Sequence, residues 1–155
     1  MSVYLVQHGR NLPGEQDPEK PLSPEGREEV EHTAGLAADY GVKVSRIEHS
    51  PKKRAKQTAE IMGRKLQPGG GVRQREGIKA LDDVAPVAEE LEPDSNLMLV
   101  GHLPFMEKLS GYLITGNETP RVIKFVNGGI VCLDRDDQGW FLKWTLIPER
   151  GYKGR

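Results

Sequence analysis

Short apolar runs and amphipathic stretches alternate along this chain. Residues 3–6 and 97–100 are unbroken runs of Val, Leu, Tyr and Met, a pattern typical of strands that are buried on both faces of a sheet. Weaker strand signals occupy residues 46–49, 72–75, 122–126, 130–133 and 140–146. These segments predict a sheet whose strands are distributed over the whole chain.

The segments between the expected strands carry helix signals. Ser23-Pro24 and Ser50-Pro51 each place a capping residue before a proline, which favours a helix start at both places. The first of these helices ends at Gly41 and has an apolar face made of Val30, Ala34, Ala37 and Tyr40. The second carries a stripe made of Ala55, Thr58, Ala59, Met62 and Leu66. Two further helices are expected at residues 84–91 and from Pro104 onward.

This order of elements predicts the fold class. Strands alternate with helices as far as the fourth helix, and the last three strands follow as a hairpin-like end, with turns at residues 127–129 and 136–139. Such alternation indicates an α/β protein, a three-layer α/β/α sandwich with a mainly parallel central sheet. A length of 155 residues fits one domain over residues 1–155, with a loose tail after Pro148.

Composition narrows the classes of function. The chain carries 22 Lys and Arg against 23 Asp and Glu, so a net charge of −1 gives no basic field for nucleic acid or for a membrane surface. Its apolar runs are far shorter than the ~18 residues of a membrane span, and its start lacks the features of a signal peptide. The single cysteine, Cys132, forms no internal disulfide and fits a cytoplasmic location.

Three residues with phosphate chemistry are expected at one edge of the sheet. His8 directly follows the first strand, Arg54 lies in the first turn of the helix after the second, and His102 follows the strand at 97–100. Ligands of open α/β sheets bind beyond the carboxyl ends of the strands. Two imidazoles and a guanidinium suit phosphoryl transfer, with one histidine as nucleophile and the arginine as a bidentate clamp.

The first turn of that same helix is unusually basic. Lys52, Lys53 and Arg54 face the positive end of the helix dipole, which disfavours each by ~0.3–1 kcal/mol unless an anion binds there. Lys52 and Lys53 are therefore interpreted either as part of an anion site or as solvated surface side chains. His49 either lines the pocket edge or is structural, and no histidine pair has the spacing of a metal site.

Three motifs in the expected order carry a family resemblance. Residues 5–9, LVQHG, resemble the strand and Arg-His-Gly signature of the histidine phosphatase superfamily, which includes the phosphoglycerate mutases. Residues 50–58, SPKKRAKQT, are similar to its Ser-Pro-x-x-Arg-Ala-x-x-Thr element. Residues 101–104, GHLP, resemble its second-histidine element and, with PLSPEG at 21–26, its SixA-type phosphohistidine phosphatase branch. The resemblance therefore implies a phosphoglycerate mutase-like fold.

The resemblance also assigns roles. It implies that His8 becomes transiently phosphorylated, that Arg54 holds the phosphoryl group, that His102 stabilises it, and that neither metal nor cofactor is needed. One position departs from the pattern, because Gln7 stands where the family has arginine. Losing a preorganised donor typically costs ~10²–10³ in rate. Arg10 either reaches into the vacancy or is a surface loop residue, so the expected phosphate-binding set is Gln7, Arg10, Arg54 and His102.

The general acid is the least determined part of the site. Asp82 is the candidate in the region where the superfamily often carries its acid, with Glu76 a weaker one, whereas Asp83 is more simply the N-cap of the next helix. Imidazole leaves with a pKa near ~6.5, whereas an alkoxide needs a delivered proton. A phosphohistidine substrate therefore tolerates a weak or missing acid.

The motifs and candidate residues lead to three hypotheses about function. The leading hypothesis is a phosphohistidine phosphatase that acts on a phosphorylated protein through a covalent intermediate on His8. The second is a phosphatase for small phosphate esters, which requires a working acid. The third is a non-catalytic module that binds phosphorylated partners, because Gln7 replaces the family arginine.

Overall fold

The computed structural model describes residues 1–148, and the expected loose tail lies outside them. The strands are β1 (Val3–Gln7), β2 (Arg46–His49), β3 (Val72–Gln74), β4 (Leu97–Gly101), β5 (Ile130–Asp136) and β6 (Gly139–Leu146). The helices are α1 (Pro24–Asp39), α2 (Lys53–Leu66), α3 (Ala85–Glu90) and α4 (Phe105–Thr115), with a 3₁₀ turn at Pro93–Ser95.

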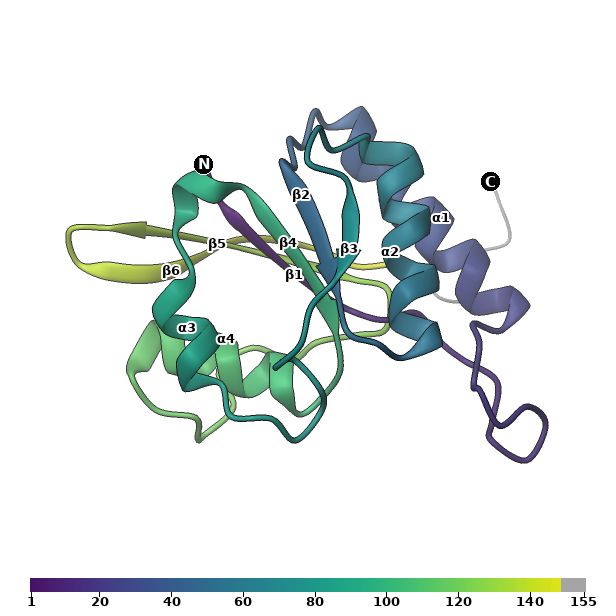
Figure 1. Ribbon diagram of the computed structural model, residues 1–155. Helices are drawn as coiled ribbons and strands as arrows, with labels where there is room; N and C mark the ends of the chain where they lie inside the picture. The colour runs from purple at the N-terminus through teal and green to yellow at the C-terminus, as the bar shows by residue number, and fades with distance from the viewer. Residues whose placement is uncertain (149–155) are drawn as a thin grey trace.

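One mixed six-stranded sheet forms the middle of the molecule, in the order β3-β2-β4-β1-β5-β6 (Figure 1). The first four of these strands are parallel to one another, and β5 and β6 complete the sheet as an antiparallel hairpin. The parallel strands β2, β4 and β1 are neighbours, so their carboxyl ends lie at one edge. This is the arrangement that the positions of the two histidines required.

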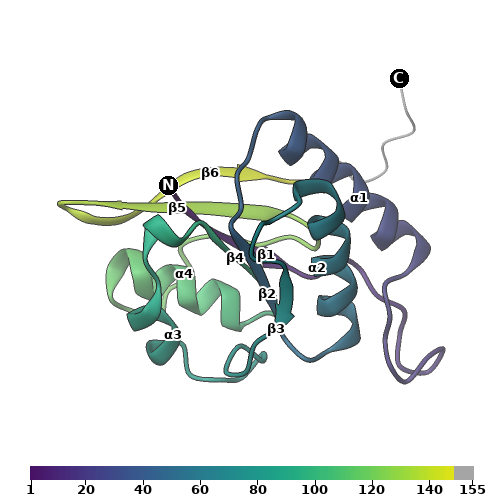
Figure 2. The ribbon, with the colours of Figure 1, turned by 45° about the horizontal axis from the view of Figure 1, so that its top comes forward.

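Helices cover both faces of the sheet, which confirms the three-layer α/β/α architecture (Figure 2). α1 and α2 pack on one face, against alternate residues of β1 and β4 such as Val6 and Val100. α3 and α4 pack on the other, against the intervening residues such as Leu5 and Leu99. Because both sets are buried, the continuous apolar runs correspond to strands without a polar face.

The two Ser-Pro signals have different outcomes. Ser23 caps α1 as expected, because its Oγ accepts a hydrogen bond from the Gly26 amide at 3.0 Å. Ser50 does not cap α2. The N-cap of that helix is Lys52, which makes no side-chain capping bond. The expected apolar stripe of α2 is confirmed as buried up to Met62, while Leu66 is partly buried.

Two further expectations about local structure are wrong. Residues 122–126 are not a strand: Ile123 and Phe125 are buried alternately, which mimics a strand pattern, but the Phe125 amide donates to Glu107 instead of to a neighbouring strand. Tyr40 is not on the buried face of α1, because it is the C-cap residue and is 73% exposed. The three-residue turn at 127–129 therefore joins an irregular segment, not a strand, to β5.

Two sequence features have a clear place in the fold. Cys132 is a free cysteine buried within β5, where it packs in the core beside α1 and α2. Across residues 1–148, none of the helices is both long enough and apolar enough to span a membrane.

Candidate active site

The two histidines predicted to converge lie side by side. Gln7 pairs with Gly101 at the ends of β1 and β4, so the next residue of each chain segment leaves the sheet at the same place. The His8 amide donates to the Gly101 carbonyl at 2.9 Å, which extends the strand pairing by one bond. The ring centroids of His8 and His102 are 5.1 Å apart, with an angle of 56° between the ring planes.

The tautomer of His8 follows from its hydrogen bond. Its Nδ1 lies 2.7 Å from the Gly9 carbonyl oxygen, and a carbonyl oxygen only accepts hydrogen bonds. The proton of a neutral imidazole is therefore on Nδ1, which leaves a lone pair on Nε2. His8 is 8% exposed and His102 is 3% exposed, so both rings are largely removed from water.

Burial also sets the charge of both rings. Desolvation is the main reason that the pKa of His8 is lowered to about 4; the Gly9 hydrogen bond opposes the shift, and the nearby Arg54 charge contributes to it. Desolvation, followed by the charges of His8, Arg54 and Lys52, lowers the pKa of His102 to about 4. Both imidazoles are therefore neutral at pH 7, which is the state that a nitrogen nucleophile needs.

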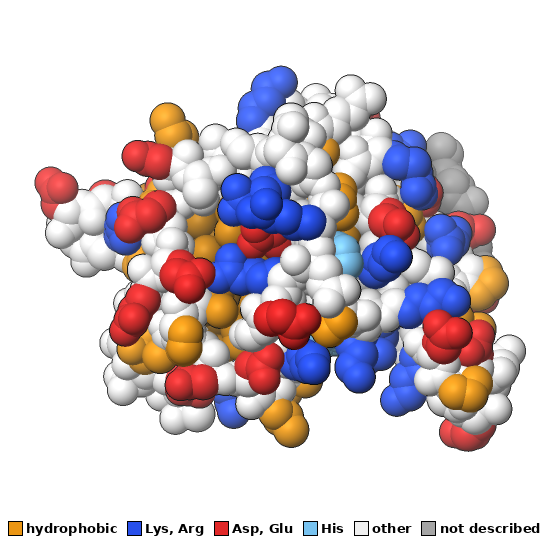
Figure 3. Space-filling model, in the orientation of Figure 1, with side chains coloured by type: hydrophobic (Ala, Val, Ile, Leu, Met, Phe, Trp, Pro, Cys, Tyr) orange, Lys and Arg blue, Asp and Glu red, His pale blue; other side chains and the backbone are white. Residues whose placement is uncertain are grey.

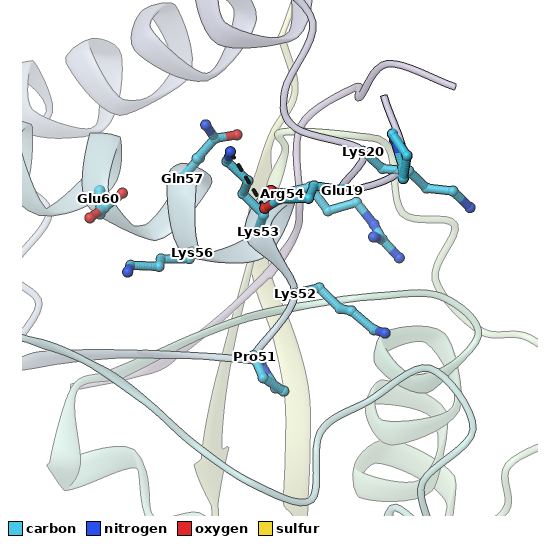
Figure 4. Close-up of a pocket in the computed structure, with 10 residues that line it drawn as sticks. Glu19, Lys20, Pro51, Lys52, Lys53, Arg54, Lys56, Gln57 and Glu60 are labelled. Carbon is cyan, nitrogen blue, oxygen red and sulfur yellow. Dashed lines mark ion pairs between the residues drawn. The ribbon is translucent and has the colours of Figure 1, made fainter. Parts of the chain in front are cut away.

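Arg54 lies beside this histidine pair. It is in the first turn of α2, its charge acts on both imidazoles, and desolvation lowers its own pKa. It also lines an open groove of about 750 Å³ that continues along α2 to Glu60 (Figure 4). Neither His8 nor His102 lines that groove. Arg54 and Lys52 connect the groove with the histidine pair, because both line the groove and the charges of both act on His102. On the face shown in Figure 3, Lys and Arg side chains lie on two sides of a histidine at the surface, with an acidic side chain close by.

Ser50 is a site residue that the sequence reading missed. It is fully buried, and its Oγ makes a hydrogen bond of 2.5 Å with Nε2 of His102. Ser50-Pro51 is typical of a helix cap, but its position carries a second signal. Ser50 directly follows β2, as His8 follows β1. The rule that placed the histidines at the carboxyl edge of the sheet also applies to this serine.

The backbone around His8 is fixed by two side chains from distant parts of the chain. Asn127 Nδ2 donates to the His8 carbonyl at 3.0 Å, and the Gly9 amide donates to Thr58 Oγ1 at 3.0 Å. The Thr58 hydroxyl in turn donates to the Arg54 carbonyl at 2.8 Å. The sequence places Asn127 in a turn, and its residue type alone does not predict that its side chain contacts the backbone of His8.

The position of the missing family arginine is uncharged in this chain. Gln7 Oε1 is buried and has no hydrogen-bond partner within residues 1–148. The Arg10 guanidinium is bound to both carboxylate oxygens of Glu29, at 2.8 and 3.2 Å. Of the two interpretations of Arg10, the structure favours a loop residue held to α1.

The candidate acids make local bonds. Asp82 Oδ2 accepts from the Lys79 amide at 2.8 Å, and Asp83 Oδ1 accepts from the Ala85 amide at 3.2 Å, close to the capping role considered for it. Glu76 accepts from the exposed Gln74 side chain. The loop that carries Asp82 does approach the end of β4, next to His102, since a Cβ on Gly101 would lie 3.3 Å from the Ile78 carbonyl oxygen.

The remaining histidines lie outside the pair. His49 is buried at the end of β2, where its Nδ1 donates to the Ser50 carbonyl at 2.7 Å. This bond favours a structural role. His32 is exposed on α1. No group of three His, Cys, Asp or Glu residues among residues 1–148 is arranged to hold a metal ion.

A three-layer fold with two neutral imidazoles and an arginine at the carboxyl edge of its sheet defines a class of phosphate-transferring enzymes. The family model of the histidine phosphatase superfamily (branch 1) matches residues 3–83, so the chain belongs to that superfamily and is a hydrolase of the phosphatase class. It lies in the SixA-type branch of the family.

The relatives that support this placement cover almost the whole chain. The chain is 28% identical over 154 residues to the phosphohistidine phosphatase SixA of Escherichia coli K12, covering 96% of this chain and 94% of that protein. A structure of the protein histidine phosphatase SixA complexed with tungstate matches with a TM-score of 0.81 at 25% identity, over 96% of this chain and 97% of the other. The putative SixA from Agrobacterium tumefaciens matches with a TM-score of 0.74 at 26% identity, over 95% and 97% of the two chains.

Proposed function

We propose that this protein removes phosphate from phosphohistidine on a protein substrate, through a covalent intermediate on His8. The observation that carries the proposal is the pair of buried, neutral imidazoles with ring centroids 5.1 Å apart beside Arg54. A neutral nitrogen with a free lone pair attacks phosphorus without prior loss of a proton, so the site needs no separate base for the first step.

The reaction has two steps. His8 Nε2 attacks the phosphorus, the bond from phosphorus to the substrate imidazole breaks, and that imidazole leaves with the electron pair of the bond. It takes up a proton from solvent, which its basicity allows near neutral pH. Water then attacks the phosphoryl group on His8, which releases inorganic phosphate and restores the neutral ring.

The other residues bind the phosphoryl oxygens. The Arg54 guanidinium supplies charge and paired N–H donors in both steps. Nδ1 of His102 makes no hydrogen bond within the described residues. When Nε2 carries the lone pair, Nδ1 carries the proton and donates a hydrogen bond to a phosphoryl oxygen. The Ser50 hydroxyl sets this tautomer by donating to Nε2. In both His8 and His102, the proposed proton is therefore on Nδ1 and the lone pair is on Nε2.

A second function is supported by one observation. Gln7 brings no charge to the position of the family arginine, and Arg10 is bound to Glu29. Without an arginine at that position, a pocket that relies on Arg54 and the nearby Lys52 holds the ground state better than it stabilises the additional charge of a transition state. A module that binds phosphorylated partners without turnover is therefore the alternative.

The decisive experiment compares two substrates. The protein is mixed with a ³²P-labelled phosphohistidine peptide and, separately, with an aryl phosphate, and released phosphate and acid-labile enzyme-bound phosphate are measured. We expect faster turnover of the phosphohistidine peptide and a labelled enzyme. His8→Ala abolishes both signals, Arg54→Ala weakens binding and turnover together, and His32→Ala serves as the control with an exposed imidazole removed.

Three outcomes contradict parts of the proposal. Equal activity of His8→Ala and the unmodified protein removes the covalent mechanism. Faster turnover of the aryl phosphate assigns the protein to small phosphate esters. Binding of the phosphohistidine peptide without phosphate release assigns it to the non-catalytic alternative.

A further inference from the structure

The groove beside Arg54 is more basic than the protein as a whole. Five cations line it against two carboxylates, a surplus of three positive charges in a chain whose net charge is −1. The cations are Lys20, Lys52, Lys53, Arg54 and Lys56, and the carboxylates are Glu19 and Glu60. Binding one phosphoryl group accounts for Arg54 and leaves most of these cations unexplained.

Most of the groove cations are not neutralised by the protein itself. Lys53 pairs with Glu19 at 3.6 Å (Figure 4), but within residues 1–148 no ion pair holds Lys20, Lys52 or Lys56. Three of the five cations come from the first turn of α2, where the helix dipole adds to their mutual repulsion. Such an arrangement is stabilised by an anionic ligand.

The shape of the groove fits an extended chain. Its volume of about 750 Å³ lies in the range of ~300–1,000 Å³ that holds ligands much larger than one phosphoryl group. Along α2 it runs from Lys53 to Glu60, which is about 10 Å at ~1.5 Å per residue. Three residues of an extended peptide span about the same distance. Residues 18–20, from the loop before α1, also line the groove.

We propose that this groove binds acidic residues next to the phosphohistidine of a protein substrate. This inference rests on the proposed function, since it places the phosphorylated side chain at His8 and the neighbouring chain in the groove. An acidic peptide matches the surplus of lysines. A nucleic acid is a poorer match, because no aromatic side chain lines the groove for base stacking.

The test uses two phosphohistidine peptides that differ only in three flanking residues, Asp and Glu in one and Asn and Gln in the other. We expect kcat/KM for the acidic peptide to be about tenfold higher at low ionic strength, with the preference falling as salt is added. In Lys20→Gln/Lys56→Gln, which breaks no ion pair of the structure, the preference should fall to about twofold.

The matched control removes the same charge elsewhere. Lys43→Gln/Lys124→Gln changes two exposed lysines, one before β2 and one before β5, and should keep the full preference. Binding of the unphosphorylated acidic peptide, followed by fluorescence anisotropy, provides a readout that does not depend on turnover. It should weaken in Lys20→Gln/Lys56→Gln and not in the control.

The outcomes separate the two proposals. Hydrolysis of both peptides at equal rates overturns the groove inference and leaves the phosphatase function intact. Absence of hydrolysis with salt-sensitive binding of the acidic peptide overturns the function and supports the groove. A preference that both double variants lose equally reflects the net charge of the protein and overturns the groove inference.

Discussion

Acidification should destabilise this protein in a range where carboxylates still keep their charge, because of the histidine pair. In the folded protein the pKa of His8 is about 4, whereas a histidine in the unfolded chain titrates near 6.5. As the pH falls below 6.5, the unfolded state binds a proton that the folded state does not bind. Stability is therefore lost from pH 6.5 down to about 4 and is retained in full above 6.5.

The size of this loss follows from the two pKa values. Between pH 8 and pH 5, a shift from 6.5 to about 4 corresponds to about 2 kcal/mol of unfolding free energy for His8 alone. His102 adds a loss of the same sign, because its pKa is also lowered to about 4. Glu48, whose pKa is lowered by hydrogen bonds from three arginines although burial opposes them, loses its contribution only at lower pH.

The assay is urea denaturation at pH 8, 6.5 and 5, followed by the fluorescence of Trp140 and Trp144. The comparison is with His8→Gln, which removes the titrating ring and keeps a polar side chain of similar reach. We expect the variant to lose about 2 kcal/mol less between pH 8 and pH 5 than the unmodified protein. Equal losses in the two proteins would refute the conclusion that His8 is held neutral by burial.

Three further predictions concern other parts of the site. Gln7→Arg should raise kcat/KM by about tenfold, or ~1.4 kcal/mol of transition-state stabilisation, in steady-state assays, whereas Arg10→Ala should change it little because Arg10 is bound to Glu29. Non-additive effects in the double variant would instead show that the two arginines share a phosphoryl oxygen. Ser50→Ala should lower kcat more than it changes KM and lower the unfolding free energy by ~1–3 kcal/mol, since His102 loses a buried partner; unchanged kcat would argue against the assigned tautomer. Asp82→Asn should leave phosphohistidine turnover within about twofold, and a large loss would identify Asp82 as the acid.

The parts of the fold that are predicted from the sequence are those with a strong local signal, such as a continuous apolar run or a helix cap. The runs at residues 3–6 and 97–100 correspond to β1 and β4, and the Ser23 cap marks the start of α1. The error at residues 122–126 comes from an alternating apolar pattern, which predicts a strand that does not form. Alternate burial follows from any extended segment that lies along a core, and the sequence does not reveal whether another strand provides hydrogen bonds.

The sequence predicts those site residues that have a suitable side chain and directly follow a strand. His8 and His102 come together because β1 and β4 are parallel neighbours. Ser50 was missed because a Ser-Pro dipeptide predicts a helix cap, as it does correctly at Ser23-Pro24. The pairing of Arg10 with Glu29 depends on how the loop after β1 packs on α1, which no local pattern encodes.

The hydroxyl of Thr58 makes the integrity of the site depend on the docking of a whole helix. It accepts from the Gly9 amide, next to the proposed nucleophile His8, and donates to the carbonyl of Arg54, the proposed phosphate clamp. Any partial unfolding that lifts the start of α2 from the sheet separates the two functional groups in the same event. A bound phosphoryl group opposes that opening by RT ln(1 + [L]/Kd), so substrate binding stabilises the packing of α2 beside the end of β1. Protection of the Gly9 amide from hydrogen exchange is then a direct measure of site occupancy.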